Sequence, residues 1–329
     1  MVESEKNLGI IGSSAYANDL RDNIRNVAQG DFPVMVLGPS GTGKELVSCA
    51  IHDCSPRKDN KLAVVNCAAI PRNLEENEFF GHVKGSFTGA LDNKLGLLSS
   101  SHNSTLFLDE VGDISLEMQA KLLRFLDSGE YMPIGSSTLK RSDTRVVCAT
   151  NKNLEQMVQE GGFREDLYYR LKGVVINTLA LSEHPEDIPE LVRFFIRRVK
   201  RNDTPKKIDD EAMGILTSYS WPGNIRELKY AIDVICMTNI GADIIKRNML
   251  YPTIKIRRKT DVNVNAPVKP YMTHKSEVVK DFDRYYFAKL LVQFGGNVSK
   301  SAQAAGMYRA NLTKKLNELG ISAKDFKST

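Results

Sequence analysis

Apolar and polar positions follow two different patterns along this chain. In the N-terminal half, short apolar runs alternate with polar stretches, and three runs have the character of buried strands: Val34-Met35-Val36-Leu37, Thr105-Leu106-Phe107-Leu108 and Arg145-Val146-Val147-Cys148-Ala149. From about Asp187 the spacing changes, because Ile188, Leu191, Val192 and Phe195 recur with the period of a helix. The sequence therefore predicts an α/β fold with a parallel sheet, followed by a helical region.

A change of composition divides the rest of the chain. Residues 251–275 hold Pro252, Pro267 and Pro270 among lysines and arginines, which is typical of a basic linker. A compact helical segment follows, from about Ser276 to Leu319. The predicted organisation is an N-terminal arm (1–8), an α/β subdomain (9–176), a helical subdomain (177–250), a basic linker (251–275) and a small all-α domain (276–329).

Composition narrows the class of protein. The residues are 42% hydrophobic and 26% charged, as in ordinary globular proteins, and no apolar run approaches the roughly 20 residues of a membrane span. The N-terminus lacks the apolar core of a signal peptide. Five cysteines without a CxxC pair argue against a disulfide framework or a zinc site. We therefore expect a cytoplasmic protein without a membrane partner. The net charge of +5 is too small to indicate nucleic-acid binding by itself.

One glycine-rich loop has the pattern of a phosphate site. Gly38-Pro39-Ser40-Gly41-Thr42-Gly43-Lys44 matches GxxxxGK between a predicted strand and a predicted helix from Glu45 to Ile51. Backbone N–H groups of such a loop close around phosphates, and the lysine reaches the outer ones. This context favours an ATP site over a simple glycine-rich turn. Glu45 stands where the general pattern has a Ser or Thr for Mg²⁺, so another residue must hold the metal.

Two pairs of polar residues follow predicted strands. Asp109 and Glu110 end an apolar strand, where carboxylates need a partner. Asp109 would hold Mg²⁺, and Glu110 would polarise the water that attacks the γ-phosphate. Thr150 and Asn151 end the next strand and would reach the same edge of the sheet, where α/β folds bind ligands. The alternatives are an acidic pair that merely turns the chain and an ordinary turn or helix cap.

The C-terminal segment has the pattern of two short helices around a turn at Gly306. The second helix would run from about Arg309 to Leu319, with Leu312, Leu316 and Leu319 on its inner side. A polar, basic outer face suits the major groove of DNA. That face would consist of Arg309, Asn311, Thr313, Lys314 and Lys315. The alternative is a basic helical hairpin used for oligomerisation.

These motifs together resemble one family, the bacterial enhancer-binding proteins, which are AAA+ ATPases that activate transcription by sigma-54 RNA polymerase. Their phosphate loop carries a glutamate after the lysine, as Glu45 does here. Their hallmark surface loop, GAFTGA, is present as Gly85-Ser86-Phe87-Thr88-Gly89-Ala90. The resemblance implies that this loop contacts sigma-54. An exposed Phe–Thr tip between glycines is costly unless something binds it.

The resemblance also implies roles for single residues. Asn66 resembles the asparagine that holds the catalytic glutamate inactive until the γ-phosphate is sensed. Arg164 and Arg170 resemble arginine fingers that reach across a subunit interface, although two arginines on a helix are more often solvated or salt-bridged. Trp221-Pro222-Gly223-Asn224-Ile225-Arg226-Glu227-Leu228 resembles the family's second sensor.

The residues of this sensor segment support a ligand role for Arg226. Asn224 and Glu227 have capping-box spacing, so Asn224 is predicted to start a helix. A cation in the first helical turn is disfavoured by the helix dipole, so Arg226 placed there indicates a phosphate nearby. The alternative is a surface arginine that is merely tolerated.

For the chain as a whole, the resemblance implies a hexamer that uses ATP and Mg²⁺ to remodel the closed complex of sigma-54 RNA polymerase into an open complex. A Fis-type helix-turn-helix domain would hold it, as dimers, on enhancer DNA. Few residues precede the ATPase domain, which leaves two sources of control open: a longer regulator from which the chain is a part, or a regulatory protein in trans.

The sequence departs from the family pattern at several positions, and the departures leave rivals to consider. Ser86 replaces an alanine, Ser99 a glutamate and Asn103-Ser104 a Gly-Gly, while Leu181-Ser182-Glu183-His184 lacks the arginine-rich LRER run. These changes leave open how efficiently ATP hydrolysis is coupled to the loop 85–90. One rival is a DNA-binding regulator with an AAA+ fold that no longer acts on sigma-54, but it would be expected to lose Phe87 or Thr88. Another is a general AAA+ unfoldase or helicase loader, against which the loop and the C-terminal segment argue.

Overall fold

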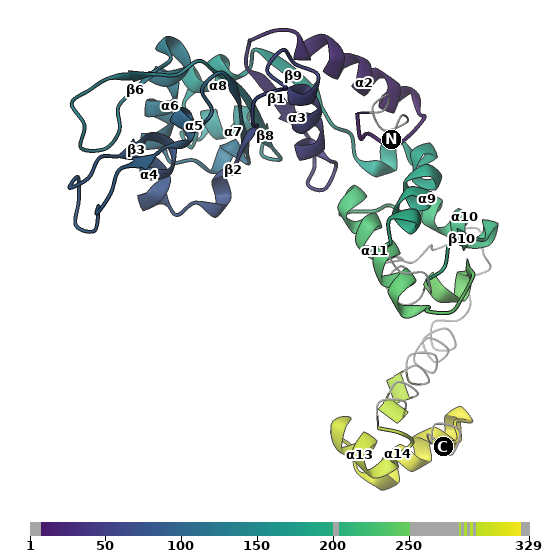
Figure 1. Ribbon diagram of the computed structural model, residues 1–329. Coiled ribbons are helices and arrows are strands. Elements are labelled where there is room, and N and C mark those ends of the chain that lie inside the picture. Colours follow the sequence, from purple (N-terminus) through teal and green to yellow (C-terminus); the bar gives the residue numbers. More distant parts are fainter. Residues whose placement is uncertain are drawn as a thin grey trace. The chain divides into compact units, whose positions relative to one another are not determined.

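The computed structural model describes residues 8–199, 204–250, 283, 286–287, 290–291 and 294–323 (Figure 1). The chain divides into two compact units, Met1–Arg258 and Lys259–Thr329. Nearly all of the predicted N-terminal arm, the whole of the predicted linker and the start of the predicted C-terminal domain lie outside the described residues. Among the described residues, no helix is long and apolar enough to cross a membrane.

The first unit is built on a five-stranded parallel sheet with the strand order β2-β5-β8-β1-β9. The three strands expected from apolar runs are confirmed as β1 (Val34–Leu37), β5 (Ser104–Asp109) and β8 (Thr144–Thr150). The sheet also contains β2 (Ala63–Asn66) and β9 (Val174–Asn177), which lie at its edges. The sequence analysis did not predict these edge strands. In β2, half-buried positions alternate with exposed ones, and in β9 only Ile176 is buried.

Helices cover both faces of the sheet (Figure 1). On one face, α2 (Ala15–Ala28) and α3 (Lys44–Asp53) pack against Val34, Val36 and Phe107. On the other face, Met35 and Cys148 belong to a second apolar core. That core is covered by α4 (Glu75–Phe80), α5 (Leu97–Ser100), α6 (Leu116–Ser128), α7 (Leu154–Gln159) and α8 (Glu165–Leu171). Burial on both faces explains why the central strands are continuously apolar.

Two antiparallel hairpins extend from this layer. In the first, β3 (Gly81–His82) pairs with β4 (Lys94–Leu95), and in the second, β6 (Glu130–Tyr131) pairs with β7 (Lys140–Arg141). His82 also bridges Ile134 in the second hairpin. The short helical turns of this region are η1 (Cys67–Ala69), η2 (Arg72–Leu74) and η3 (Val111–Asp113).

A helical subdomain, the lid, follows β9. It consists of η4 (Leu181–Glu183), η5 (Pro185–Asp187), α9 (Ile188–Arg198), β10 (Lys207–Ile208), α10 (Asp210–Ser218), α11 (Asn224–Thr238), β11 (Ile244–Ile245) and η6 (Arg247–Leu250). The helical period from Asp187 onwards is confirmed, because Ile188, Leu191, Val192 and Phe195 are all buried in the core of the lid around Trp221.

The N-terminal segment joins the lid to the sheet. Ile10 packs into the core beneath α2 and α3, whereas Ile11 packs against the core of the lid. Asp187, which is 1% exposed, accepts hydrogen bonds from the backbone N–H of Ser14 (2.9 Å) and its hydroxyl (2.6 Å). Nδ1 of His184 lies 3.0 Å from the same carboxylate. Residues 181–184, which lack the arginine-rich run of the family, therefore include a residue, His184, of the buried contact between the N-terminal segment and the lid.

The second unit contains α13 (Val298–Ala304) and α14 (Arg309–Leu319), with Gly306 between them at a φ of 65°. The predicted inner residues Leu312, Leu316 and Leu319 are buried in one cluster with Phe287, Leu291 and Ala302, which confirms the predicted inner side of the second helix.

Candidate nucleotide site and surface loop

The phosphate loop joins the end of β1 to the start of α3. Three of its glycines, Gly38, Gly41 and Gly43, have positive φ angles of 154°, 81° and 95°. A Cβ atom at Gly38 would lie 2.1 Å from Oγ1 of Thr178, so no other residue fits there. No side chain caps the first turn of α3, and its backbone N–H groups remain available for a phosphate.

Lys44 lies over this loop. Its ammonium donates hydrogen bonds to the carbonyl oxygens of Gly38 (2.9 Å) and Pro39 (3.2 Å). Burial lowers the pKa of Lys44, and the carboxylates of Glu110 and Asp109 oppose this shift. The lysine and both acidic residues are therefore close enough to influence one another, as a phosphate site requires.

The acidic pair lies at the end of β5. Burial raises the pKa of Asp109, and the neighbouring Glu110 carboxylate raises it further. Glu110 has a left-handed φ of 52°, a strained conformation for a residue with a side chain. Its carboxylate accepts a hydrogen bond from the backbone N–H of Asn151 (3.2 Å) and a weak one from the hydroxyl of Thr150 (3.5 Å). Thr150 and Asn151 thus lie beside the acidic pair and orient Glu110.

Asn66 does not contact the residue that we expected. Its side-chain amide donates to Oδ2 of Asp109 at 3.0 Å, and its carbonyl oxygen accepts from the backbone N–H of Ala69. The reason is the register of the sheet, because Asn66 is directly opposite Asp109 on the neighbouring strand. In this structure, therefore, Asn66 holds the aspartate and the residues at the end of β8 hold the glutamate.

The lid contacts the phosphate loop through the start of α11. The guanidinium of Arg226 donates to the hydroxyl of Ser40 (3.1 Å), and its backbone N–H donates to the carbonyl oxygen of Gly41 (3.2 Å). Its positive charge also helps to lower the pKa of Lys44. Arg226 therefore lies directly beside the phosphate loop.

The predicted capping box is only half correct. The helix begins at Asn224, as expected, but the carboxylate of Glu227 accepts from the backbone N–H of Gly223 (2.7 Å). The side chain of Asn224 caps nothing and instead joins Leu181 to Ser40. Its φ of 53° shows why, because a residue in the left-handed region cannot adopt the extended backbone of an N-cap.

Thr178 is a further residue at the phosphate loop, and the sequence did not indicate it. It directly follows β9 and is 3% exposed. Its hydroxyl lies 2.7 Å from the hydroxyl of Thr42 and 3.2 Å from the carbonyl oxygen of Leu37. A lone threonine at the end of a strand carries no motif, and only the pairing of β9 with β1 brings it to the loop.

Arg164 and Arg170 both make contacts within their own chain. Arg164 forms a two-point ion pair with Asp166 (2.7 and 3.0 Å). Arg170 lies 3.1 Å from Asp127 and donates to the carbonyl oxygen of Leu126. The two arginines are 44% and 47% exposed, and neither contacts the phosphate loop among the described residues. The salt-bridged alternative therefore holds within one chain, and a role across a subunit interface stays a prediction.

The loop 85–90 lies between β3 and β4. Gly85 and Gly89 have φ angles of 83° and 104°. The backbone N–H of Gly85 donates to the carbonyl oxygen of Ala90 (2.9 Å), which closes the loop. Phe87 is 45% exposed, with its ring edge against His82, and Thr88 is exposed. The departure at Ser86 places a buried hydroxyl without a hydrogen-bond partner against Gly135 of the second hairpin.

The outer face of α14 differs from the prediction at one residue. Arg309, Asn311, Thr313 and Lys314 are exposed, as expected. Lys315 is half-buried and forms an ion pair with Asp283 at 2.7 Å. Asp283 lies 32 residues before Lys315 in the sequence, and no local pattern links the two. The exposed basic face of α14 therefore does not include Lys315.

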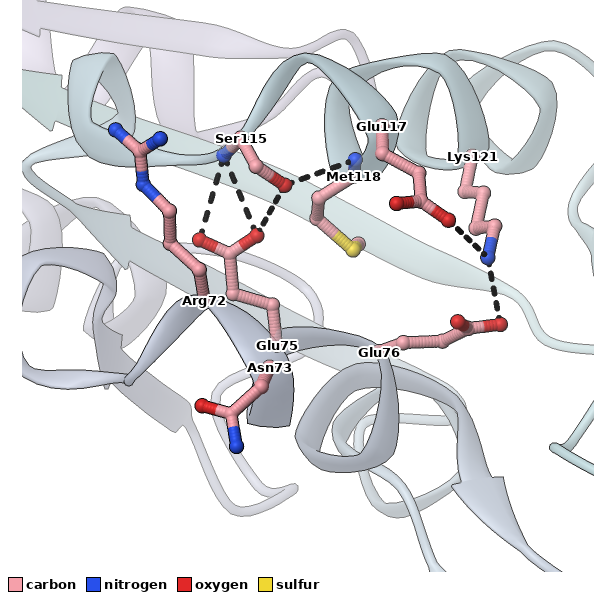
Figure 2. Close-up of a pocket in the computed structure, with 8 residues that line it drawn as sticks. All are labelled: Arg72, Asn73, Glu75, Glu76, Ser115, Glu117, Met118 and Lys121. Carbon is pink, nitrogen blue, oxygen red and sulfur yellow. Dashed lines mark hydrogen bonds and ion pairs between the residues drawn. The ribbon is translucent and has the colours of Figure 1, made fainter.

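A separate cavity of about 150 Å³ lies between the starts of α4 and α6 (Figure 2). The buried carboxylate of Glu75 accepts hydrogen bonds there from the hydroxyl of Ser115 (2.5 Å) and its backbone N–H (3.2 Å). Lys121 pairs with Glu76 and Glu117 at the same wall. These groups satisfy one another, so we interpret the cavity as a structural joint between the two helices.

A phosphate loop with a buried lysine, an acidic pair on the strand that ends beside it and a helical lid in contact with the loop define the class of AAA+ ATPases. Comparisons with known proteins give the family. Residues 10–177 match the family described as Sigma-54 interaction domain, and residues 182–267 match the one described as AAA+ ATPase lid domain. The chain belongs to the Sigma-54 interaction domain family and is a sigma-54-dependent transcriptional activator with an AAA+ ATPase domain.

Individual relatives agree with this family. The DNA-binding transcriptional regulator NtrC of Rhizobium meliloti is 36% identical over 97% of this chain and 71% of its own length. The transcriptional regulatory protein ZraR of Salmonella typhimurium is 39% identical over 95% of this chain and 69% of its own. The crystal structure of NtrX from Brucella abortus in complex with ATP has a TM-score of 0.70 and 34% identity, and the match covers 94% of this chain and 69% of that one.

Proposed function

We propose that this chain assembles into a ring, hydrolyses MgATP at the interfaces of the ring and uses the energy to remodel sigma-54 RNA polymerase from the closed to the open complex. The loop 85–90 would grip sigma-54, and the second unit would hold the activator on enhancer DNA.

The proposed chemistry assigns one task to each group at the phosphate loop. The loop amides and Lys44 would bind the phosphates, and Arg226 would add a positive charge from the lid. Asp109 would hold Mg²⁺, which neutralises charge on the β- and γ-phosphates when bound. Support for this comes from the raised pKa of Asp109 beside Glu110, because two adjacent carboxylates favour a cation. Glu110, oriented by Asn151, would take the proton of the attacking water.

We propose a ring because, among the described residues, neither candidate arginine finger contacts the phosphate loop of its own chain. Arg164 and Arg170 are about half exposed and make their contacts away from the phosphate loop. Either arginine would therefore reach a transferring phosphate only on a neighbouring copy, where it would add to the charges of Lys44 and Arg226. We expect turnover per subunit to rise with protein concentration. Constant turnover from monomers would contradict shared sites.

The observation that carries the proposal is the loop 85–90. It exposes Phe87 and Thr88 on a closed turn, and neither side chain can assist phosphoryl transfer. A ring and a hydroxyl held out in this way fit a protein partner. The direct test is open-complex formation on a sigma-54 promoter in vitro. We expect open complexes with ATP and none with a non-hydrolysable analogue, and their absence in both cases would refute the proposal.

The DNA contact is proposed for the exposed face of α14, namely Arg309, Asn311, Thr313 and Lys314. Two of these residues are cationic, so the affinity for DNA should fall as salt rises and counterion release becomes less favourable.

A further inference from the structure

Asn224 has a conformation and an environment that its position at the start of α11 does not explain. It is the first residue of α11, is 3% exposed and has a φ of 53°. Asparagine is one of the few residues with a side chain that tolerates this region of the backbone. The strain and the burial together indicate that the side chain has a specific task.

The side-chain amide of Asn224 bridges two segments that are far apart in the sequence. Its Oδ1 accepts a hydrogen bond from the backbone N–H of Leu181 (2.9 Å), at the entry to the lid. Its Nδ2 donates to the backbone carbonyl oxygen of Ser40 (2.8 Å), in the phosphate loop. The partners fix which atom is which, because an N–H can only donate and a carbonyl can only accept. Aspartate could make the first bond but not the second.

The neighbours of Asn224 strengthen the same junction. The backbone N–H of Arg226 donates to Gly41, and a Cβ atom at Gly41 would lie 2.4 Å from the carbonyl oxygen of Gly223. The start of α11 is therefore packed directly on the backbone of the phosphate loop, with the Arg226 guanidinium beside Ser40.

We propose that Asn224 is a positioning residue that ties the lid to the phosphate loop and thereby places Arg226 for the nucleotide. This inference rests on the nucleotide site proposed above. Asn224 acts through the carbonyl of Ser40 and not on the nucleotide itself. A shift of the loop when nucleotide binds or leaves would pass through this amide to the entry of the lid.

The test uses the full chain with Asn224→Gly, which keeps the positive φ and removes both bonds, and Asn224→Asp, which keeps only the acceptor. We expect each variant to bind a fluorescent ATP analogue about tenfold more weakly. In Asn224→Gly, the amide of Leu181 should also exchange hydrogen faster without nucleotide. Asn239→Ala, at the other end of α11, is the matched control and should bind normally.

A double-mutant cycle with Arg226→Ala distinguishes a role in positioning Arg226 from a general effect on the stability of the fold. If Asn224 places Arg226, the double variant should bind ATP no more weakly than Arg226→Ala alone. Additive losses, or unchanged affinity in both Asn224 variants, would overturn the inference. Failure of the wild-type chain to bind nucleotide would instead refute the proposed site, and the inference with it.

A second, independent observation concerns Tyr308 in the other unit. It occupies the N-cap of α14, makes no capping hydrogen bond and is 83% exposed, more than any other large apolar side chain that the structure describes. Ser, Thr, Asp and Asn are preferred at an N-cap because their side-chain oxygens accept from the first turn. The sequence thus omits a cap here and exposes an aromatic ring.

The position of Tyr308 suits a contact with nucleic acid. It directly precedes the exposed Arg309 and lies one turn before the exposed Asn311. A phenol can donate to a phosphate oxygen and place its ring against sugar or base. We infer that Tyr308 contacts DNA at the start of α14, which rests on the DNA binding proposed above.

We expect the substitution Tyr308→Ser to lower the affinity for DNA and to stabilise the start of α14. Serine should cap α14, so the amides of residues 309–312 should exchange hydrogen more slowly in the full chain. Affinity for duplex DNA that the wild-type chain selects from a random pool should fall about fivefold. Tyr230→Ser, an exposed tyrosine on α11, should change neither.

Three results would count against this inference. Unchanged DNA affinity would show that the ring makes no contact. Lower affinity with faster exchange would show that Tyr308 is merely structural. If the wild-type chain selects no DNA, the proposed DNA-binding function is wrong and the inference falls with it.

Discussion

Two glycine-bounded loops in this protein use the same residue type for opposite physical reasons. In the phosphate loop, Gly38 and Gly41 are crowded, since a Cβ atom would lie 2.1 Å from Thr178 and 2.4 Å from the carbonyl of Gly223. In the loop 85–90, Gly85 and Gly89 have positive φ angles but no atom within 4 Å of a Cβ position. Gly38 and Gly41 therefore need glycine for close packing as well as for backbone conformation. Gly85 and Gly89 need it only for backbone conformation, as Gly43 does in the phosphate loop.

This difference matches the contacts of each loop. The phosphate loop is held by Thr178 from β9 and by Asn224 and Arg226 from the lid. The loop 85–90 closes mainly on itself through Gly85 and Ala90 and exposes its tip. Preorganised groups suit a site for chemistry, whereas an open tip suits a partner that binds and leaves. Substitutions should therefore separate hydrolysis from partner binding.

The largest effect is expected on the chemical side. Glu110→Gln removes the proposed base but keeps an oxygen for the N–H of Asn151. We expect ATP binding to persist while the rate of hydrolysis falls about 10³-fold. A phosphate-release assay beside a nucleotide-binding titration measures both. Glu160→Gln, at the exposed end of α7, is the control, and normal turnover in Glu110→Gln would mean that another group is the base.

The complementary change is Thr88→Ala in the open tip. Because Thr88 is exposed and lies outside the phosphate site, we expect hydrolysis and assembly to change less than about twofold. Binding to sigma-54 in the presence of ADP–aluminium fluoride should be lost, and transcription from a sigma-54 promoter with it. Thr238→Ala at the end of α11 should leave both intact. If Thr88→Ala activated transcription normally, the role assigned to the loop would be wrong.

The glycines themselves provide a direct contrast. Gly38→Ala must displace Thr178, so we expect a loss of about 3 kcal/mol in the free energy of unfolding and loss of ATP binding. Gly85→Ala meets no atom and should cost only the left-handed conformation, about 1 kcal/mol. Urea unfolding followed by the fluorescence of Trp221, the single tryptophan, measures the difference. Equal losses would show that crowding does not distinguish the loops.

Local sequence patterns predicted the parts of this molecule that depend on neighbouring residues. The strands β1, β5 and β8, the phosphate loop and the inner leucines of α14 follow from apolar runs, glycine spacing and helical period. Contacts between distant segments were not predictable in this way. Thr178 reaches Thr42, and Lys315 pairs with Asp283, only because tertiary packing brings these segments together.

Asn66 shows the same limit at closer range. Its place on β2 was consistent with a role beside the acidic pair, but which carboxylate it contacts depends on the register between β2 and β5. A shift of one residue would have pointed it to the other side of the sheet. The resemblance to a family correctly placed Asn66 beside the acidic pair. The register of the strands determines that it contacts Asp109.

The smallest effect concerns the acidic pair in the absence of nucleotide. Burial and the charge of Glu110 raise the pKa of Asp109 above its usual 3.8, so the folded chain holds this proton more tightly than the unfolded chain. Ionised Asp109 therefore destabilises the fold at neutral pH. This penalty shrinks as the pH falls through the raised pKa of Asp109 and is gone below 3.8. Asp109→Asn removes the charge and can still accept the hydrogen bond from Asn66.

We expect Asp109→Asn to raise the Tm of the nucleotide-free chain by about 2 °C at pH 7, with the gap narrowing as the pH approaches 4. MgATP hydrolysis should be lost in the same variant, because the proposed Mg²⁺ ligand is gone. Calorimetry over this pH range, with Asp59→Asn as an exposed control, tests the sign. A variant less stable than wild type at pH 7 would contradict this expectation, because it would mean that the carboxylate of Asp109 stabilises the nucleotide-free fold. The arrangement of charged groups at the phosphate loop would then carry no cost in the free energy of unfolding.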